Sequence, residues 1–260
     1  MTNIRSIEEF HENLAVPEAC MLGKRLFKKQ FYEHGQLGTT DKKAFVEDID
    51  GIEWRYTIKP ATINVPKLED DAHEYLEIAI LQVVLTVADH HLRIASVIQK
   101  AIPYPLVIFF VCGSRLAVNA ADKRVNRADA NKIVTEASYD TGWIDLAAPE
   151  AAQAAFLSDF RVTNFSYRNL YDFYQDAVAR IIALNCAVHT GRYALQAEAS
   201  DAPKGKTERL EALRQIEKFQ RERNELRNKL KKEKNLGSQV SLNTKIKQLG
   251  DRIEAVRNEM

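Results

Sequence analysis

Residues 75–112 read YLEIAILQVVLTVADHHLRIASVIQKAIPYPLVIFFVC, and this stretch decides the fold class. Its first part, Tyr75–Leu85, is long and rich in branched residues, which predicts a central strand. Asp89 is expected to cap a helix whose apolar positions recur every three to four residues up to Ile102. The run Leu106–Cys112 is continuously apolar, as is typical of a buried strand. Strand, helix and strand in this order predict an α/β fold.

The flanking segments predict the rest of a mixed sheet with packed helices. Alternation of apolar and polar residues or short apolar runs predict further strands at Ile52–Ile58, Ala61–Val65, Arg115–Ala120, Lys132–Ser138 and Thr141–Leu146. The charged segment Asp122–Asp129 is expected to be a loop. Before the sheet, Ser6 is expected to cap a short helix and Asp41 to begin another.

The C-terminal part is helical. Phe165–His189 has apolar residues at spacings of three and four, which predicts a long amphipathic helix. From Thr207 onward, leucine and isoleucine repeat in steps of three and four, and Asn235–Ser238 interrupts the pattern. We therefore expect an antiparallel coiled-coil hairpin, with one continuous helix as the alternative. The predicted domains are an α/β core with an N-terminal basic segment (1–200) and the hairpin (207–260).

The apolar stripe of this hairpin is a candidate surface for a partner. It is narrow and rimmed with charge, which suits docking of a larger protein or of a second copy. The candidate partner-binding residues are Leu226, Leu230, Leu242, Ile246, Leu249 and Ile253.

Charge is divided unevenly along the chain. Residues 1–200 carry 21 Lys and Arg against 26 Asp and Glu, whereas residues 201–260 carry 16 against 10. A basic C-terminal piece suggests contact with nucleic acid, and its alternative is an ordinary solvated helical surface.

A second basic cluster lies near the N-terminus. Its cations can neutralise phosphates and a neighbouring ring can stack on a base. If the segment is helical, Lys24 and Lys28 share a face. The alternative is a solvated helix with Phe27 and Phe31 packed on the core. The candidate DNA-binding residues are Lys24, Arg25, Lys28, Lys29 and Tyr32.

Motifs of common enzyme classes are missing from the sequence. It has no Gly-rich phosphate loop, no Cys-x-x-Cys and no His-Glu-x-x-His. His90 and His91 are adjacent, so on a helix they point apart and suit a shared metal poorly. We assign no catalytic residue and expect no cofactor or metal, although activity stays open. Three scattered cysteines and an uncharged apolar run of 12 residues, Ala101–Cys112, favour a cytoplasmic protein without a membrane span.

The sequence partly supports one class of enzyme, a metal-dependent nuclease. A restriction-type nuclease places Asp on one strand and Glu-x-Lys on the next, where the carboxylates bind Mg²⁺. Asp70 and Asp71 precede the central strand and Glu77 is expected on it, but Ala79 stands at the lysine position. Lys59 from a neighbouring strand is the substitute that the sequence offers.

Several stretches together resemble the bacterial family catalogued as domain of unknown function 4391. The clearest is Lys100–Pro105, with its Ile-Pro-Tyr-Pro, followed by an apolar strand. Further stretches similar to the family are Lys28–Glu33, Asp48–Trp54, Tyr56–Val65, Leu170–Tyr174 and Leu242–Lys247. The resemblance spans about residues 22–260 and supplies no catalytic residue.

The resemblance implies a bacterial cytosolic protein, often encoded beside helicases and DNA methyltransferases of restriction or antiphage defence loci. We therefore expect a non-catalytic accessory subunit of such a complex, with the hairpin docking a partner and the Lys28 segment contacting DNA. The alternatives are a degenerate or unrecognised metal-dependent nuclease and a homodimeric scaffold that never meets nucleic acid.

Overall fold

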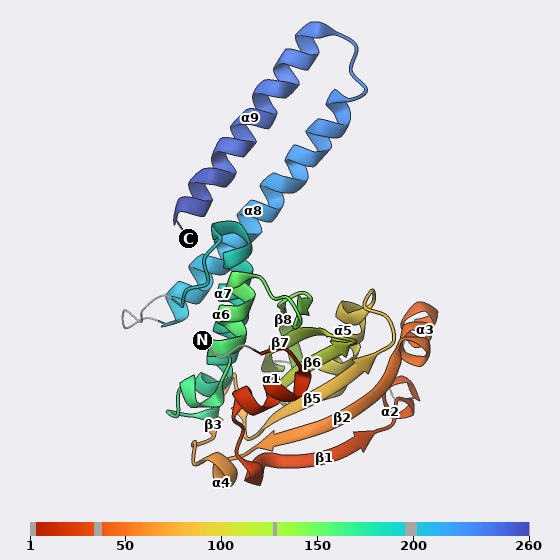
Figure 1. Cartoon of the computed structure of the whole chain (residues 1–260). Helices are drawn as coiled ribbons and strands as arrows, with labels where there is room; N and C mark the ends of the chain where they lie inside the picture. Colours follow the sequence, from red (N-terminus) through yellow and green to blue (C-terminus); the bar gives the residue numbers. More distant parts are fainter. Residues whose placement is uncertain (1–3, 34–37, 127–128, 196–201, 260) are drawn as a thin grey trace. The chain divides into compact units, whose positions relative to one another are not determined.

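The computed structural model describes residues 4–33, 38–126, 129–195 and 202–259. The chain forms two compact units, Met1–Ile181 and Ile182–Met260, and their elements are labelled in Figure 1. The boundary falls inside helix α7 (Leu170–Thr190). Among the described residues, no helix combines the length and the apolarity needed to cross a membrane.

A seven-stranded mixed sheet forms the centre of the first unit. Neighbouring β5 and β6 run parallel, joined through α5 (His91–Ala101), and the other neighbouring pairs are antiparallel. In spatial order the strands are β1 (Met21–Leu26), β2 (Ile49–Ile58), β5 (Ile78–Leu85), β6 (Leu106–Cys112), β7 (Arg115–Asn126) and β8 (Asp129–Asp140), with β9 (Ile144–Asp145) also paired to β7. The predicted mixed α/β sheet is confirmed.

Both faces of the sheet are covered, because alternate residues of its central strands point to opposite sides. Ala79, Leu81 and Val83 of β5 belong to a buried cluster with residues of three helices. These helices are α2 (Lys29–Glu33), α3 (Thr39–Glu47) and α5. Ile78 and Ile80 face the other side. That side is covered by α1 (Ile7–Leu14), the segment that follows α6 (Ala151–Asp159), and the first part of α7.

The expected capping residue of α1 is confirmed. Ser6 Oγ accepts a hydrogen bond from the backbone N–H of Glu9 at 3.2 Å. For α5 the cap differs from the expectation, since His90 rather than Asp89 occupies the N-cap position. The predicted central strand is also interrupted: Glu74–Tyr75 is a short strand, β4, that pairs with β3 (Leu68–Glu69) before β5 begins.

The strand predicted at Ala61–Val65 is wrong, because Pro60–Ile63 forms the short helix α4. Pro60 stands near the first helical position, where its fixed φ and missing N–H are compatible with a helix. Thr62 Oγ1 accepts a hydrogen bond from the N–H of Lys59 at 2.9 Å, and Asn64 ends the helix with φ of 58°.

The loop expected at Asp122–Asp129 is also wrong, since β7 and β8 continue into this charged segment. Polar side chains pair between the two strands there. Arg124 forms an ion pair with Glu136, and Tyr139 Oη donates a hydrogen bond to Asp122 Oδ2 at 2.6 Å. Such pairs stabilise strands whose composition alone suggests a loop.

The second unit contains the end of α7, α8 (Ala202–Leu230) and α9 (Leu236–Glu259). The helices α8 and α9 pack along each other as an antiparallel hairpin (Figure 1), as the sequence predicts. Ile216 of α8 and Leu249 and Ile253 of α9 are buried. In the described part of the first unit, short 3₁₀ turns are formed by η1 (Glu18–Cys20) and η2 (Val162–Asn164).

Candidate interaction surfaces on the hairpin and the edge strand

The apolar seam of the hairpin changes in exposure along its length. The seam comprises the six candidate residues Leu226, Leu230, Leu242, Ile246, Leu249 and Ile253. Leu249 and Ile253 are buried, with 7% and 3% exposed. The four residues nearer the turn are half-buried. Because a hairpin offers each seam residue one facing helix, the flanks of this outer part stay open to a further protein surface.

The turn between the two helices is held by its own polar groups. Asn235 Oδ1 accepts a hydrogen bond from the N–H of Ser238 at 3.1 Å, which caps α9. Glu233 Oε1 accepts hydrogen bonds from the N–H groups of Lys234 and Asn235, both at 2.8 Å. Beside these groups, Leu236 and Val240 are 78% and 61% exposed. The turn therefore presents apolar side chains on an ordered backbone.

The basic segment near the N-terminus lies in a different element from the one expected. Residues Met21–Leu26 form β1, which is an edge strand of the sheet, so the predicted shared helical face of Lys24 and Lys28 is wrong. Lys24 and Arg25 are exposed. In the register of the two strands, they pair with Trp54 and Glu53 of β2. Adjacent strand residues point to opposite faces, so these two cations do not form one patch.

Lys28 has a structural role. Its Nζ donates hydrogen bonds to the backbone carbonyl of Val46, at 3.1 Å, and to that of Ile49. Phe31 is buried with its ring centroid 5.4 Å from that of Phe45, as the packing alternative expected, whereas Phe27 is 68% exposed. Lys29 is exposed in α2, and the side chain of Tyr32 lies outside the described residues.

The residues of the nuclease alternative are partly brought together. Lys59 Nζ lies 3.1 Å from Glu77 Oε2, but Glu77 precedes β5 instead of lying on it. Asp70 Oδ1 accepts hydrogen bonds from the N–H groups of Ala72 and His73 at 2.8 and 2.7 Å. Within the described part of the chain, no three His, Cys, Asp or Glu side chains are arranged to hold a metal ion.

The two adjacent histidines separate toward different carboxylates. His90 Nδ1 lies 2.6 Å from Asp48 Oδ2, and His91 Nε2 lies 3.1 Å from Asp140 Oδ1. His91 Nδ1 also lies 3.2 Å from the carbonyl oxygen of Ala88. Both ring nitrogens of His91 thus face acceptors, and the residue connects the start of α5 to the end of β8.

Lys123 is a buried cation that the sequence analysis missed. Its Nζ donates hydrogen bonds to the carbonyls of Ile102 and Tyr104, at 2.6 and 2.7 Å, so it holds the Ile-Pro-Tyr-Pro segment. Burial lowers the pKa of Lys123 to about 7. Continuing the strand alternation of β7 through the charged segment is the signal that locates this side chain facing the core.

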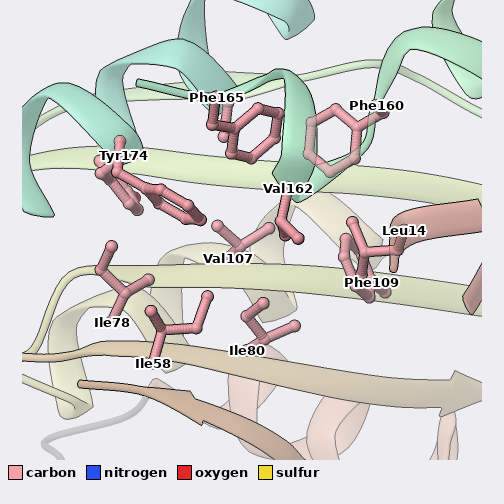
Figure 2. A pocket seen from close by; sticks show the side chains of 12 residues that line it. Leu14, Ile58, Ile78, Ile80, Val107, Phe109, Phe160, Val162, Phe165 and Tyr174 are labelled. Atoms are coloured by element: carbon pink, nitrogen blue, oxygen red, sulfur yellow. The ribbon is translucent and has the colours of Figure 1, made fainter. Parts of the chain in front are cut away.

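An apolar cavity of about 20 Å³ lies on the face of the sheet covered by α7 (Figure 2). This volume is close to that of a single water molecule. Its lining includes Val107, Phe109 and Phe160. Tyr174 also lines it, but its hydroxyl hydrogen-bonds the backbone of Leu106 and Ala121. The cavity is therefore a packing void of the core and offers no polar group to a substrate.

Fold and surfaces together define a class of protein: a mixed α/β sheet that carries a basic two-helix hairpin at its C-terminal end. Residues 14–253 match the family model described as Domain of unknown function (DUF4391). The chain belongs to this family, which confirms the resemblance seen in the sequence. No curated protein and no solved structure matches the chain.

Proposed function

We propose that this chain is a non-catalytic accessory subunit of a bacterial DNA-targeting restriction or defence complex, and that its hairpin docks the partner. The observation that carries the proposal is the half-buried outer seam, Leu226, Leu230, Leu242 and Ile246, in a hairpin of helices 29 and 24 residues long. The partner class, a helicase or DNA methyltransferase, follows the expectation from the family resemblance.

Docking on the outer seam has a clear physical basis. A further helix laid along it completes the burial of side chains that two helices leave half-exposed. Removing their remaining apolar surface from water is favourable by roughly 25 cal/mol per Å².

A second copy of the chain fits the outer seam less well. The residues 227–247 around it carry seven Lys and Arg against a single Glu. Two hairpins joined in parallel place these like charges together, and such juxtaposition is unfavourable. We therefore favour an adapter over the homodimeric scaffold.

Co-purification tests this proposal. The tagged chain, expressed with its neighbouring genes, is expected to recover a helicase or methyltransferase in stoichiometric amount. The variant Leu230→Asp/Ile246→Asp is expected to lose it, since both charges enter the seam. Val188→Asp is the control, because it introduces one of the same charges at an apolar residue that is 74% exposed outside the hairpin.

The comparison needs folded protein, so helix content is measured by circular dichroism for each variant. Recovery of the chain alone, or equal recovery by the seam variant with its helix content intact, contradicts docking through the hairpin.

Contact of the N-terminal basic segment with DNA is a separate part of the proposal. Lys24, Arg25 and Lys29 are exposed, and Lys28 is engaged with backbone carbonyls. Alanine substitutions at all four positions are expected to weaken DNA binding by the complex and to reduce its salt dependence. Unchanged affinity and unchanged salt dependence exclude this segment as the DNA contact.

A further inference from the structure

The strongest concentration of charge lies at the turn of the hairpin. We define the hairpin tip as residues 227–247, which include the end of α8, the turn and the start of α9. The tip carries seven cations and one anion, Glu233. The cations are Arg227, Lys229, Lys231, Lys232, Lys234, Lys245 and Lys247, and all seven are exposed.

The protein itself does not neutralise this charge. Glu233 uses Oε1 to accept backbone N–H groups of the turn. Across the described ranges of the chain, the ion pairs found include none of the tip cations, while lower on α9 Arg257 pairs with Glu254 at 3.2 Å. Seven unpaired cations on one end of a hairpin create a positive potential that attracts a polyanion.

The tip is also hollowed. A recess of about 500 Å³ lies there, lined by Lys229, Lys232, Glu233, Ser238, Ser241 and Leu242. Lysine ammonium groups and serine hydroxyls are donors that commonly contact phosphate oxygens in nucleic-acid complexes. Ser238 stands in the first turn of α9, where the helix dipole also favours an anion.

We infer that the hairpin tip binds the phosphodiester backbone of duplex DNA. The tip contains no Phe, Tyr or Trp on which an unpaired base stacks, so a duplex is favoured over a single strand. An anionic membrane is less well matched: the strongly exposed apolar side chains of the tip are Leu236 and Val240, short of the broad apolar face of an interfacial helix.

The inference rests on the proposed function for its choice of DNA over RNA. The contact is with backbone phosphates, so binding is expected to be independent of base sequence and strongly weakened by salt. It also assigns a role to the basic C-terminal piece that the docking of a protein partner leaves unexplained.

Binding of the isolated full-length chain to a short mixed-sequence DNA duplex, measured over a series of salt concentrations, tests the inference. Lys229→Gln/Lys232→Gln is expected to weaken binding roughly tenfold or more at low salt and to reduce the slope of log K against log salt by about 2. Lys229→Arg/Lys232→Arg is expected to retain binding. The matched control Lys218→Gln/Arg221→Gln removes as much charge from α8 outside the tip and is expected to bind as the unaltered chain does.

Three results overturn the inference. The first is absence of duplex binding by the unaltered chain at low salt. The second is equal loss in the control, or loss in a Lys24→Gln/Arg25→Gln variant instead of the tip variant. The third is tighter binding to phosphatidylserine vesicles, to duplex RNA or to an acidic peptide, with the same dependence on Lys229 and Lys232. No partner protein is present, so failure here is distinguishable from failure of the co-purification.

Discussion

Lys123 and His11 are buried titratable side chains, and burial lowers the pKa of both. Each lies in the first unit and each hydrogen-bonds groups distant in sequence. Lys123 joins β7 to the Ile-Pro-Tyr-Pro segment. His11 of α1 lies on the sheet, with Nε2 2.7 Å from Gln82 Oε1 of β5. Both side chains are buried, so their charged forms are poorly solvated.

The lowered pKa of Lys123 predicts that the free energy of unfolding increases with pH above neutrality. Its pKa falls from 10.5 to about 7 on folding, so between these values the unfolded chain binds the extra proton. From pH 7 to pH 9 this group is expected to add about 2 kcal/mol to the free energy of unfolding. Urea denaturation of the unaltered chain and of Lys123→Met at both pH values measures it. The variant is expected to lack this increment, and equal pH dependence in the two proteins contradicts the account.

The lowered pKa of His11 predicts that the free energy of unfolding decreases in acid. Burial lowers its pKa from 6.5 to about 4, so the unfolded chain binds the extra proton between these values. As the pH falls from 6.5 to 4.5, the free energy of unfolding is expected to drop by about 2 kcal/mol through this group. Denaturation of His11→Gln over the same range is expected to show a flatter profile. Parallel profiles for the two proteins are the contrary result.

At the scale of single elements, apolar patterns predicted most of the sheet. Alternation predicted β2, runs of branched or apolar residues predicted β5 and β6, and spacings of three to four predicted helices α5 and α7. Segments whose structure depends on one special residue or on a distant partner were predicted wrongly. The segment predicted as a strand after Pro60 is the helix α4, because Pro60 is compatible with the first helical position. The basic segment around Lys24 is a strand, because it pairs with β2.

For the candidate sites as well, some features could be predicted from the sequence and others could not. Repeating leucine and isoleucine predicted the hairpin and its seam, and counting charges located its basic character. The recess at the tip could not be predicted, because it depends on how Lys229 of α8 and Lys232 of the turn lie beside Ser238 and Ser241 of α9. Nor could the engagement of Lys28, which depends on backbone carbonyls about 20 residues further on.

The seam is expected to be strongly stabilising at its buried end and weakly so at its outer end. Ile253→Ala removes a side chain that is 3% exposed and is expected to lower the free energy of unfolding by about 2–4 kcal/mol. Leu242→Ala, at a half-buried position, is expected to cost roughly 1 kcal/mol. Chemical denaturation followed by helical circular dichroism measures both. Equal losses of unfolding free energy in the two variants contradict the proposal that a partner completes the burial of the outer seam.

At the scale of the whole molecule, the basic excess of the chain falls within its second compact unit. The sheet has its own core between two layers of helices, and residues 1–200 carry an excess of acidic side chains. The basic excess is confined to residues 201–260, which form the hairpin and the segment before it. This concentration of basic charge supports the proposal that the hairpin interacts with other molecules.

We propose that the hairpin docks a different protein rather than a second copy of the chain. Light scattering of the purified full-length chain over a range of concentrations tests this most directly, followed by addition of the co-purified helicase or methyltransferase. If the hairpin docks a different protein, the chain alone is expected to have a mass of 29.6 kDa. A stoichiometric complex is expected once the partner is added. A mass twice that value, maintained on dilution and reduced by Leu230→Asp/Ile246→Asp, contradicts the claim and identifies a homodimeric scaffold.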